Sequence, residues 1–245
     1  MSDDQSSTAK NSTLDSTRWG VAASYHKVMR DMRTVNEIVI KGAIEVVFFV
    51  SKTPQLVVAS DNPEAVDSVH TRFVENKLVI EREGMSFSIG RGNVVVTGNG
   101  RIAAGGDIYV NGDRITPSKT GAEGSCMVAV VLPDAPDFQI SGSGEATLYS
   151  VKQDSLALTV SGSGGLTVYG QVQRLSAEIS GSGDVDCSDL SAESARLQIS
   201  GSGTVSALVT KDVDATVSGS GSITVRGGPE QRKERTSGSG RTRFK

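Results

Sequence analysis

The sequence predicts an all-β fold, a right-handed parallel β-helix with a repeat of about 19 residues that follows a β-rich N-terminal segment. The first observation behind this prediction is the four-residue phrase Ser-Gly-Ser-Gly, which begins at Ser141, Ser161, Ser180, Ser200, Ser218 and Ser237. The steps between phrases are 20, 19, 20, 18 and 19 residues, and a regular period of this length is typical of a solenoid. The second observation is that apolar residues occupy every second position on both sides of the phrase, which is the pattern of strands.

Each coil is therefore expected to contain a strand, a glycine corner, a second strand and a return. We expect glycine at the corner because a tight turn needs a positive φ or a close backbone approach, and Cβ opposes both. The corner glycines are Gly142, Gly144, Gly162, Gly164, Gly181, Gly183, Gly201, Gly203, Gly219, Gly221, Gly238 and Gly240. Coils stacked about 4.8 Å apart over five intervals build a rod about 24 Å long.

The last coil is polar where the others are apolar. Arg232, Glu234 and Thr236 stand where the preceding coil has Val213, Ala215 and Val217. A polar last coil is typical of a cap that ends a solenoid.

The repeated phrase also resembles a known family. An aliphatic residue before Ser-Gly-Ser-Gly and an apolar residue two positions after it, recurring behind a β-rich segment, resemble the auto-transporter adhesin head GIN domain family. A strand with the pattern K-L-x-I precedes the repeats, at Lys77, Leu78 and Ile80. The resemblance covers about residues 35–240. It implies a right-handed β-helix and suggests adhesion, and it carries no catalytic residues.

The composition favours one kind of fold and excludes two classes of partner. The 245 residues include 28 glycines and only 4% aromatic residues, which favours an elongated β fold over a globule with one thick core. The net charge of −3 and the pI near 5.5 predict neither a nucleic-acid partner nor binding to a membrane surface. No stretch reaches the ~20 apolar residues of a membrane span.

The first 34 residues divide into a polar tail and a predicted short helix. Residues 1–17 are too polar to bury much surface. From residue 19 to 33, Val21, Tyr25, Val28 and Met32 have the spacing of one helix face. The start lacks the basic residues and apolar run of a secretory signal. We therefore expect a protein made in the cytoplasm that stays there or enters a virion, with a surface location less favoured.

Residues 35–89 are expected to form strands and turns. Apolar alternation around Gly42 predicts two strands, and further strands follow with turns at 61–63 and 75–76. The stretch from Pro63 to Val69 also has the pattern of one helical turn.

Residues 90–125 depart from the family pattern and are expected to be an insertion of short strands. Hairpin signals occur at 98–100 and 111–113. Polar and aromatic residues here have no explanation in the stacking of coils: Arg91, Asn93, Asn99, Arg101, Asp107, Tyr109, Asn111 and Arg114. Two interpretations stay open, hairpins that only cover one flank of the rod or a surface that binds a partner. The chain then returns to the repeats, which extend over 126–245.

The sequence offers no site for catalysis, a cofactor or a metal. The two histidines, His26 and His70, lie near no nucleophile motif, and no zinc motif occurs. Glu145, Asp184 and Thr204 share an outward column, but its two acids lie two coils apart, which does not make a glycosidase pair. Cys126 and Cys187 form no CxxC pair, and Cys187 falls on an inward position, so a buried free thiol is expected.

Function is therefore predicted to be structural, in a rod that is not an enzyme. The first hypothesis is a module that binds a protein or glycan partner or associates with itself, with a homotrimer as the favoured oligomer. The alternatives are a phage virion component, an exported cell-surface adhesin and, least favoured, an enzyme acting on polysaccharide.

Overall fold

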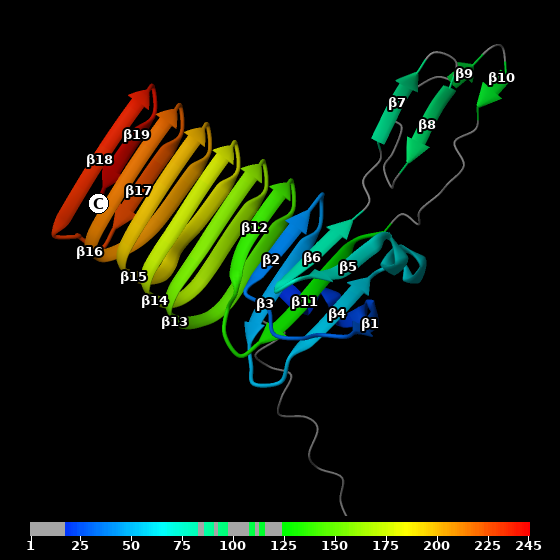
Figure 1. Ribbon diagram of the computed structural model, residues 1–245, viewed down its shortest axis with the longest axis horizontal. Helices are drawn as coiled ribbons and strands as arrows, with labels where there is room; N and C mark the ends of the chain where they lie inside the picture. The colour runs from blue at the N-terminus through cyan, green and yellow to red at the C-terminus, as the bar shows by residue number, and fades with distance from the viewer. Residues whose placement is uncertain (1–17, 83–85, 91–92, 98–107, 111–112, 116–123) are drawn as a thin grey trace, which may run out of the picture.

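The Ser-Gly-Ser-Gly phrases stack in register and build a right-handed parallel β-solenoid (Figure 1). This computed structural model describes residues 18–82, 86–90, 93–97, 108–110, 113–115 and 124–245. Four long strands each run from one phrase to the next: β13 (Glu145–Gly162), β14 (Gly165–Gly181), β15 (Asp184–Gly201) and β16 (Thr204–Gly219). Each pairs in parallel with the next, and Gly162, Gly181 and Gly201 align. The predicted β-helix is confirmed.

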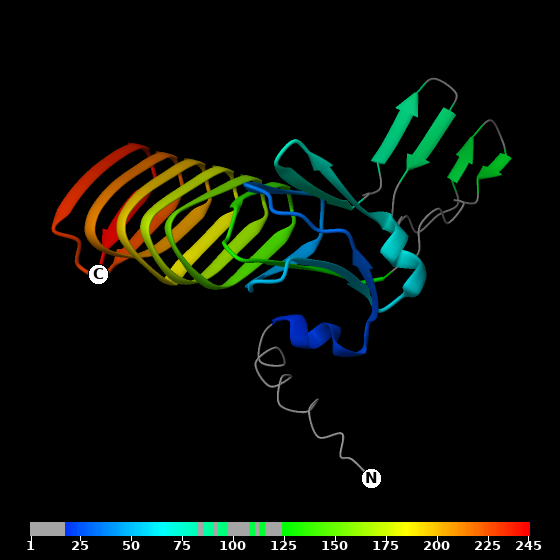
Figure 2. The ribbon, with the colours of Figure 1, turned by 60° about the horizontal axis from the view of Figure 1, so that its bottom comes forward.

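Each long strand bends and contributes to two faces (Figure 2). Face 1 contains the halves that end at the phrases, with β12 (Asp137–Gly142) at one side and β18 (Gln231–Gly238) at the other. Face 2 contains the halves that follow the phrases, together with β17 (Ser222–Arg226) and β19 (Arg241–Phe244). Alternate side chains of both faces point inward and fill one apolar core along the rod.

The N-terminal segment continues the solenoid. β2 (Glu37–Lys41) pairs in parallel with β12, and β3 (Glu45–Val50) pairs in parallel with β13. The turn between β2 and β3 contains Gly42, and a Cβ on Gly142 would lie only 3.2 Å from the backbone nitrogen of Gly42. This pair of strands is therefore a coil of the rod that lacks the Ser-Gly-Ser-Gly phrase.

One more coil precedes this one, and residues 83–125 occupy its corner. β6 (Lys77–Arg82) pairs in parallel with β2, and β11 (Cys126–Leu132) pairs in parallel with β3. Since β6 ends where Gly42 and the other corners lie, the segment between β6 and β11 replaces the short glycine corner. The chain thus leaves the rod for the insertion at the column of glycine corners.

Antiparallel strands close this end of the rod. β5 (Val69–Val74) pairs with β6 on face 1. On face 2, β4 (Gln55–Ser60) pairs with β11, and β1 (His26–Arg30) pairs with β4. The turn predicted at residues 63–69 is the 3-10 helix η2 (Pro63–Ser68). The change to antiparallel pairing ends the parallel stack, which limits polymerisation through its edge.

The insertion contains two hairpins. β7 (Ser86–Gly90) pairs with β8 (Asn93–Thr97), and β9 (Ile108–Val110) pairs with β10 (Asp113–Ile115). The second connection coincides with the hairpin signal at 111–113. The first lies at 91–92, while the signal at 98–100 lies outside the described residues.

The helix predicted from residue 19 to 33 is wrong beyond Ser24. A 3-10 helix, η1, covers Arg18–Ser24, and the chain then enters β1. β1 pairs with β4 along its whole length, whereas an isolated helix of this length is only marginally stable. The guanidinium of Arg30 fixes the strand, because it donates to the carbonyl oxygens of Val69 (2.6 Å) and Val66 (3.2 Å).

The last coil has a neighbour on one side only. β18 pairs with β16, and every residue of β18 is exposed. The guanidinium of Arg232 lies over the ring of Phe244, 4.8 Å from its centroid. This contact covers the end of the apolar core with a cation.

The two glycines of a corner are required for different reasons. Gly181 has a φ of 132°, and a Cβ there would overlap the carbonyl oxygen of Gly162 in the preceding coil. Gly183 is buried, and its Cβ would lie 2.5 Å from the carbonyl oxygen of Gly164 and 2.6 Å from Cγ1 of Val160. The corner is therefore closed to side chains both by conformation and by contact with the coil before it.

Replacing Gly181 by Val is expected to lower the free energy of unfolding by more than about 1 kcal/mol, through strain at positive φ and overlap with backbone. The matched control is Gly165→Val, because a Cβ at Gly165 has no atom closer than 3.9 Å. Thermal and denaturant unfolding measure both. Equal stability of the two variants would contradict this account of the corner.

Candidate binding surfaces

The predicted partner residues lie on an insertion with anchored ends. The guanidinium of Arg82 donates to the carbonyl oxygen of Gly124 (2.6 Å), and the amide of Ser125 donates to the carboxylate of Asp61 (2.8 Å). The first bond joins the two ends of the insertion to each other, and the second joins its C-terminal end to the residue before the turn into η2. Hydrogen bonds therefore fix the point at which the insertion leaves the rod.

The structure describes the backbone of three of the eight predicted residues. Asn93, Tyr109 and Arg114 belong to β8, β9 and β10. The other five lie outside the described residues: Arg91, Asn99, Arg101, Asp107 and Asn111. A binding role for this set stays a prediction.

A groove on face 1 was missed by the sequence analysis. It has a volume of about 670 Å³ and crosses the starts of the face 1 strands at residues 155–157, 174–176, 194–196, 212–214 and 231–233. Five coils span four intervals, so the groove is about 19 Å long and runs parallel to the rod axis. Small side chains such as Ser155, Ala157, Ser176 and Ser194 leave it open.

The acidic side chains of the groove already have partners. Asp214 forms ion pairs with Lys233 (3.3 Å) and with Arg235 (3.1 Å). Asp212 accepts a hydrogen bond from the hydroxyl of Ser194 (3.2 Å). Asp137 likewise accepts one from a backbone amide, that of Ala157 (2.9 Å).

Two cations of the groove have no such partners. Arg174 and Arg196 are exposed and line it, and neither has an ion pair within the described part of the chain. Their guanidinium groups are therefore free to bind an anion. The sequence does contain a signal for this groove. On either side of the first inward residue of the face 1 strands, the outward positions of three successive coils hold only Ser, Ala or Arg.

Face 2 carries a row of stacked aromatic rings. The ring of Tyr149 stacks on Phe49 (centroids 5.5 Å apart) and on Tyr169 (5.2 Å). The phenol of Tyr149 accepts a hydrogen bond from the amide of Arg18 (3.1 Å), and the Arg18 guanidinium contacts Glu145 (3.0 Å). These contacts fix η1 across the outer side of face 2.

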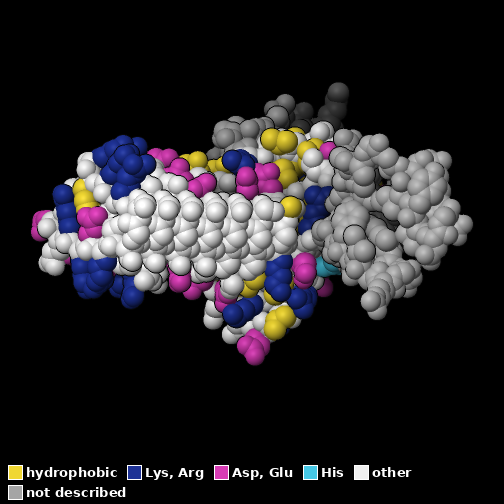
Figure 3. Space-filling model, turned by 90° about the horizontal axis from the view of Figure 1, so that it is seen from above, with side chains coloured by type: hydrophobic (Ala, Val, Ile, Leu, Met, Phe, Trp, Pro, Cys, Tyr) yellow, Lys and Arg dark blue, Asp and Glu magenta, His cyan; other side chains and the backbone are white. Residues whose placement is uncertain are grey.

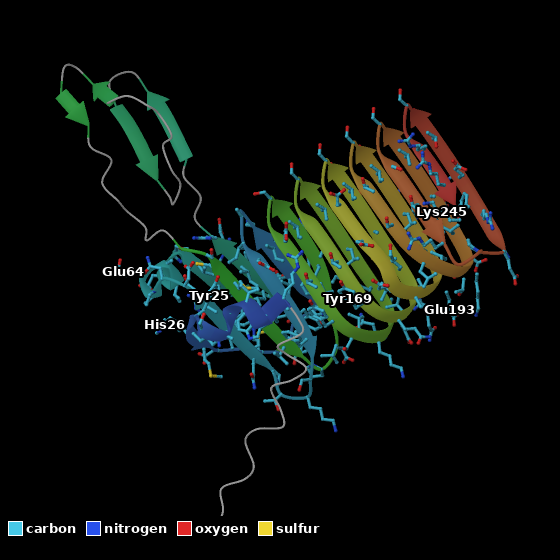
Figure 4. The ribbon with its side chains drawn as sticks, turned by 180° about the vertical axis from the view of Figure 1, so that it is seen from behind. Tyr25, His26, Glu64, Tyr169, Glu193 and Lys245 are labelled. Atoms are coloured by element: carbon cyan, nitrogen blue, oxygen red, sulfur yellow. The ribbon has the colours of Figure 1, made fainter. Side chains whose placement is uncertain are left out.

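Tyr169 ends this row at the surface (Figure 4). Partial burial raises its pKa above the ordinary value, and Tyr149, Asp189 and Asp186 raise it further. Tyr169 therefore stays a neutral hydrogen-bonding group at physiological pH.

The described residues contain no arrangement that suits catalysis. Glu145 and Asp184 are separated by Gly165 in their column, as expected from the sequence. His26 is exposed on β1. Within the described ranges, no group of three His, Cys, Asp or Glu side chains could hold a metal ion. Nor does any helix in this part of the chain have the length and apolar character to cross a membrane.

The cysteines are buried and unpaired, as predicted for Cys187. Burial raises the pKa of the Cys187 thiol to about 12, and the nearby charge of Asp186 adds to the effect. Cys126 lies against the carbonyl oxygen of Ala65 (3.4 Å). The environment of Cys187 is therefore not that of a reactive thiolate.

The described part of the chain is a β-solenoid with a groove on face 1 and a row of stacked aromatic rings on face 2. The comparison with known families agrees with this fold. Residues 35–229 match the family described as "Putative auto-transporter adhesin, head GIN domain". The chain belongs to this family. No curated protein is similar enough in sequence to be counted as a match.

Solved structures with a similar fold include proteins from Bacteroides and Parabacteroides species. A putative adhesin from Bacteroides fragilis has a TM-score of 0.60 and 14% identity, covering 90% of this chain and 97% of its own. A putative adhesin from Parabacteroides distasonis has a TM-score of 0.51 and 15% identity, covering 90% and 97%. A putative lipid binding protein from the same species has a TM-score of 0.50 and 19% identity, covering 90% and 96%. At such low identity these similarities establish the fold.

We expect both thiols to resist Ellman's reagent in the native protein at pH 8 and to react once guanidinium unfolds it. The raised pKa of Cys187 favours the folded state below about pH 9, and this stabilisation is lost as the pH rises toward 12. The absorbance of the chromophore released by the reagent gives the number of reactive thiols in the folded and in the unfolded protein. Rapid reaction of either thiol in the folded protein would show that its surroundings open to solvent.

Proposed function

We propose that this protein is a non-enzymatic interaction module, a rigid rod that presents loops and side-chain rows to a partner. The observation that carries the proposal is the replacement of a glycine corner by residues 83–125. The repeats need only a few residues to turn this corner, so stacking does not explain the added chain. Loops held on a rigid scaffold are where binding residues concentrate.

Membership of a family named for adhesins supports an adhesin role and a surface or exported location. This finding counts against the expectation of a cytoplasmic or virion protein. None of the relatives described above points to a phage component or to an enzyme acting on polysaccharide.

We also propose that the rod self-associates, with a homotrimer as the favoured form. The solenoid offers long, regular faces, whereas its N-terminal end is closed by antiparallel strands. Association through the faces is therefore favoured over end-to-end growth, and a closed cyclic oligomer satisfies this geometry.

Deleting residues 91–114 and joining the ends by a short turn is expected to leave the solenoid folded and to abolish adhesion. The rod should survive because its pairing does not involve the insertion. Beads coated with either chain can be tested on immobilised mucin, collagen and fibronectin, with the melting temperature as the control for folding. A folded deletion variant that adheres like the full chain would show that the insertion is not the binding surface.

Light scattering at micromolar concentration is expected to give three times the chain mass of 25.6 kDa. A mass of 25.6 kDa would rule out self-association and leave a heterologous partner.

A further inference from the structure

The two arginines of the face 1 groove that lack an ion pair each follow a serine in the preceding coil. Arg174 is aligned with Ser155 in the coil before it and with Ser194 in the coil after it. In the neighbouring column, Arg196 is aligned with Ser176 in the coil before it and with Asp214 in the coil after it. Serine at these positions satisfies the stacking, so the coil does not need either guanidinium.

Several other outward charges of the solenoid form ion pairs with the neighbouring coil. Lys211 contacts Glu193 (2.7 Å), and Lys233 and Arg235 both contact Asp214. Arg174 and Arg196 line the groove from adjacent coils, and Arg196 is aligned with Asp214 in the next coil. The carboxylate of Asp214 is paired with Lys233 and Arg235, so neither arginine has an ion pair among the described residues. Their position favours a bound anion over an internal ion pair.

The end of the rod adds a strong positive field. Residues 226–245 contain seven basic and two acidic residues, a net charge of +5, whereas residues 137–225 contain four basic and ten acidic residues, a net charge of −6. The basic side chains gather at the end of the rod (Figure 3). Arg232 and Lys233 belong to this end and also line the groove. An anionic ligand is therefore attracted toward the end at which the groove terminates.

Figure 4 places Lys245 at this end and Glu64 at the opposite end of the rod. The opposite end, residues 18–82, contains nine Lys or Arg and eight Asp or Glu residues, a net charge of +1. This nearly neutral net charge does not complement the +5 of the basic end. A separate anionic molecule is therefore a better complement than the opposite end of a second copy.

We propose that the face 1 groove binds a linear acidic polysaccharide, whose carboxylate or sulfate groups contact Arg174, Arg196 and Lys233. The groove crosses the strands, so a peptide lying in it could not add main-chain hydrogen bonds as an extra strand would. Recognition depends on side chains that recur at the coil spacing of about 4.8 Å. Serine hydroxyls and guanidinium groups on this repeat suit a ligand that is itself a repeating chain of hydroxyl and anionic groups.

A lipid bilayer suits the site less well. Binding of the rod to a membrane surface calls for apolar side chains beside the basic ones. The exposed large apolar side chains of the described residues are Val21, Met29, Val50, Val74 and Tyr169. None of them lies on the last coil or lines the groove. The observations therefore favour a soluble polyanion.

This proposal rests on the interaction function and names the ligand class of one surface. The test uses the full chain and its double variant Arg174→Ser/Arg196→Ser, which restores the serine of neighbouring coils. The matched control is Arg241→Ser/Arg243→Ser, with the same change of charge on face 2, where the aligned residues are Ser222 and Thr224. Binding is measured by calorimetry with polygalacturonate and dextran sulfate, with neutral dextran and anionic phospholipid vesicles as comparisons.

The wild-type chain should bind at least one of the two polyanions, more weakly as salt is added, and should not bind neutral dextran. Loss of two charge-assisted contacts should weaken binding by about tenfold or more in the groove variant. The face 2 variant should lose less than about threefold. Melting temperatures of both variants should match the wild type.

Three results would overturn the proposal: wild-type binding to neither polyanion or to vesicles alone, equal weakening of both variants, or a groove variant that binds like the wild type. The deletion variant without residues 91–114 distinguishes a failure of this proposal from a failure of the proposed adhesin function. It should bind the polyanion at full affinity even though its adhesion to the protein panel is lost. Loss of polyanion binding on this deletion would place the site in the insertion and also contradict the proposal.

Discussion

Each Ser-Gly-Ser-Gly corner rests directly on the backbone of the corner before it, and the coil spacing depends on this contact. The amide of Ser182 donates to the carbonyl oxygen of Gly162 at 2.9 Å, and the amide of Ser202 donates to Gly181 at 2.8 Å. A side chain on either corner glycine would enter the space of that carbonyl group. Because the corner is this close, both faces can keep the spacing of a β-sheet, and the inward side chains form one continuous core.

The same constraint separates residues that serve the fold from residues available for function. Corner glycines and inward apolar residues are fixed by stacking, while outward positions tolerate Gly165, Glu145 or Asp184 in one column. The groove and the aromatic row are built from the variable outward positions, and the insertion likewise lies outside the positions that stacking fixes. The protein therefore places its candidate binding groups on a scaffold that changes little when they vary.

The repeats could be predicted from the sequence because the phrase and the apolar alternation both report local geometry. The coil formed by β2 and β3 could not, since its corner reads Lys41-Gly42-Ala43 and only parallel pairing with β12 and β13 reveals it. The position of the insertion depends on the same long-range pairing. Strand β1 was mistaken for helix because pairing with β4 outweighs the local apolar spacing. The groove was missed because it is made of residues that lie about 19 positions apart, none of which is unusual alone.

Hydrogen exchange of the corner amides tests the central claim most directly. Serine and glycine at a surface turn ordinarily exchange quickly, but here the amides of Ser163, Ser182, Ser202 and Ser220 each donate to a glycine carbonyl of the preceding coil. Residues 227–228 form the matched comparison, because they lie in the exposed return of the last coil. The account predicts that the four serine amides are protected as strongly as the core strands, while the amides of residues 227–228 exchange fast. Equally fast exchange at the corners would contradict the view that stacked glycine corners hold the rod together.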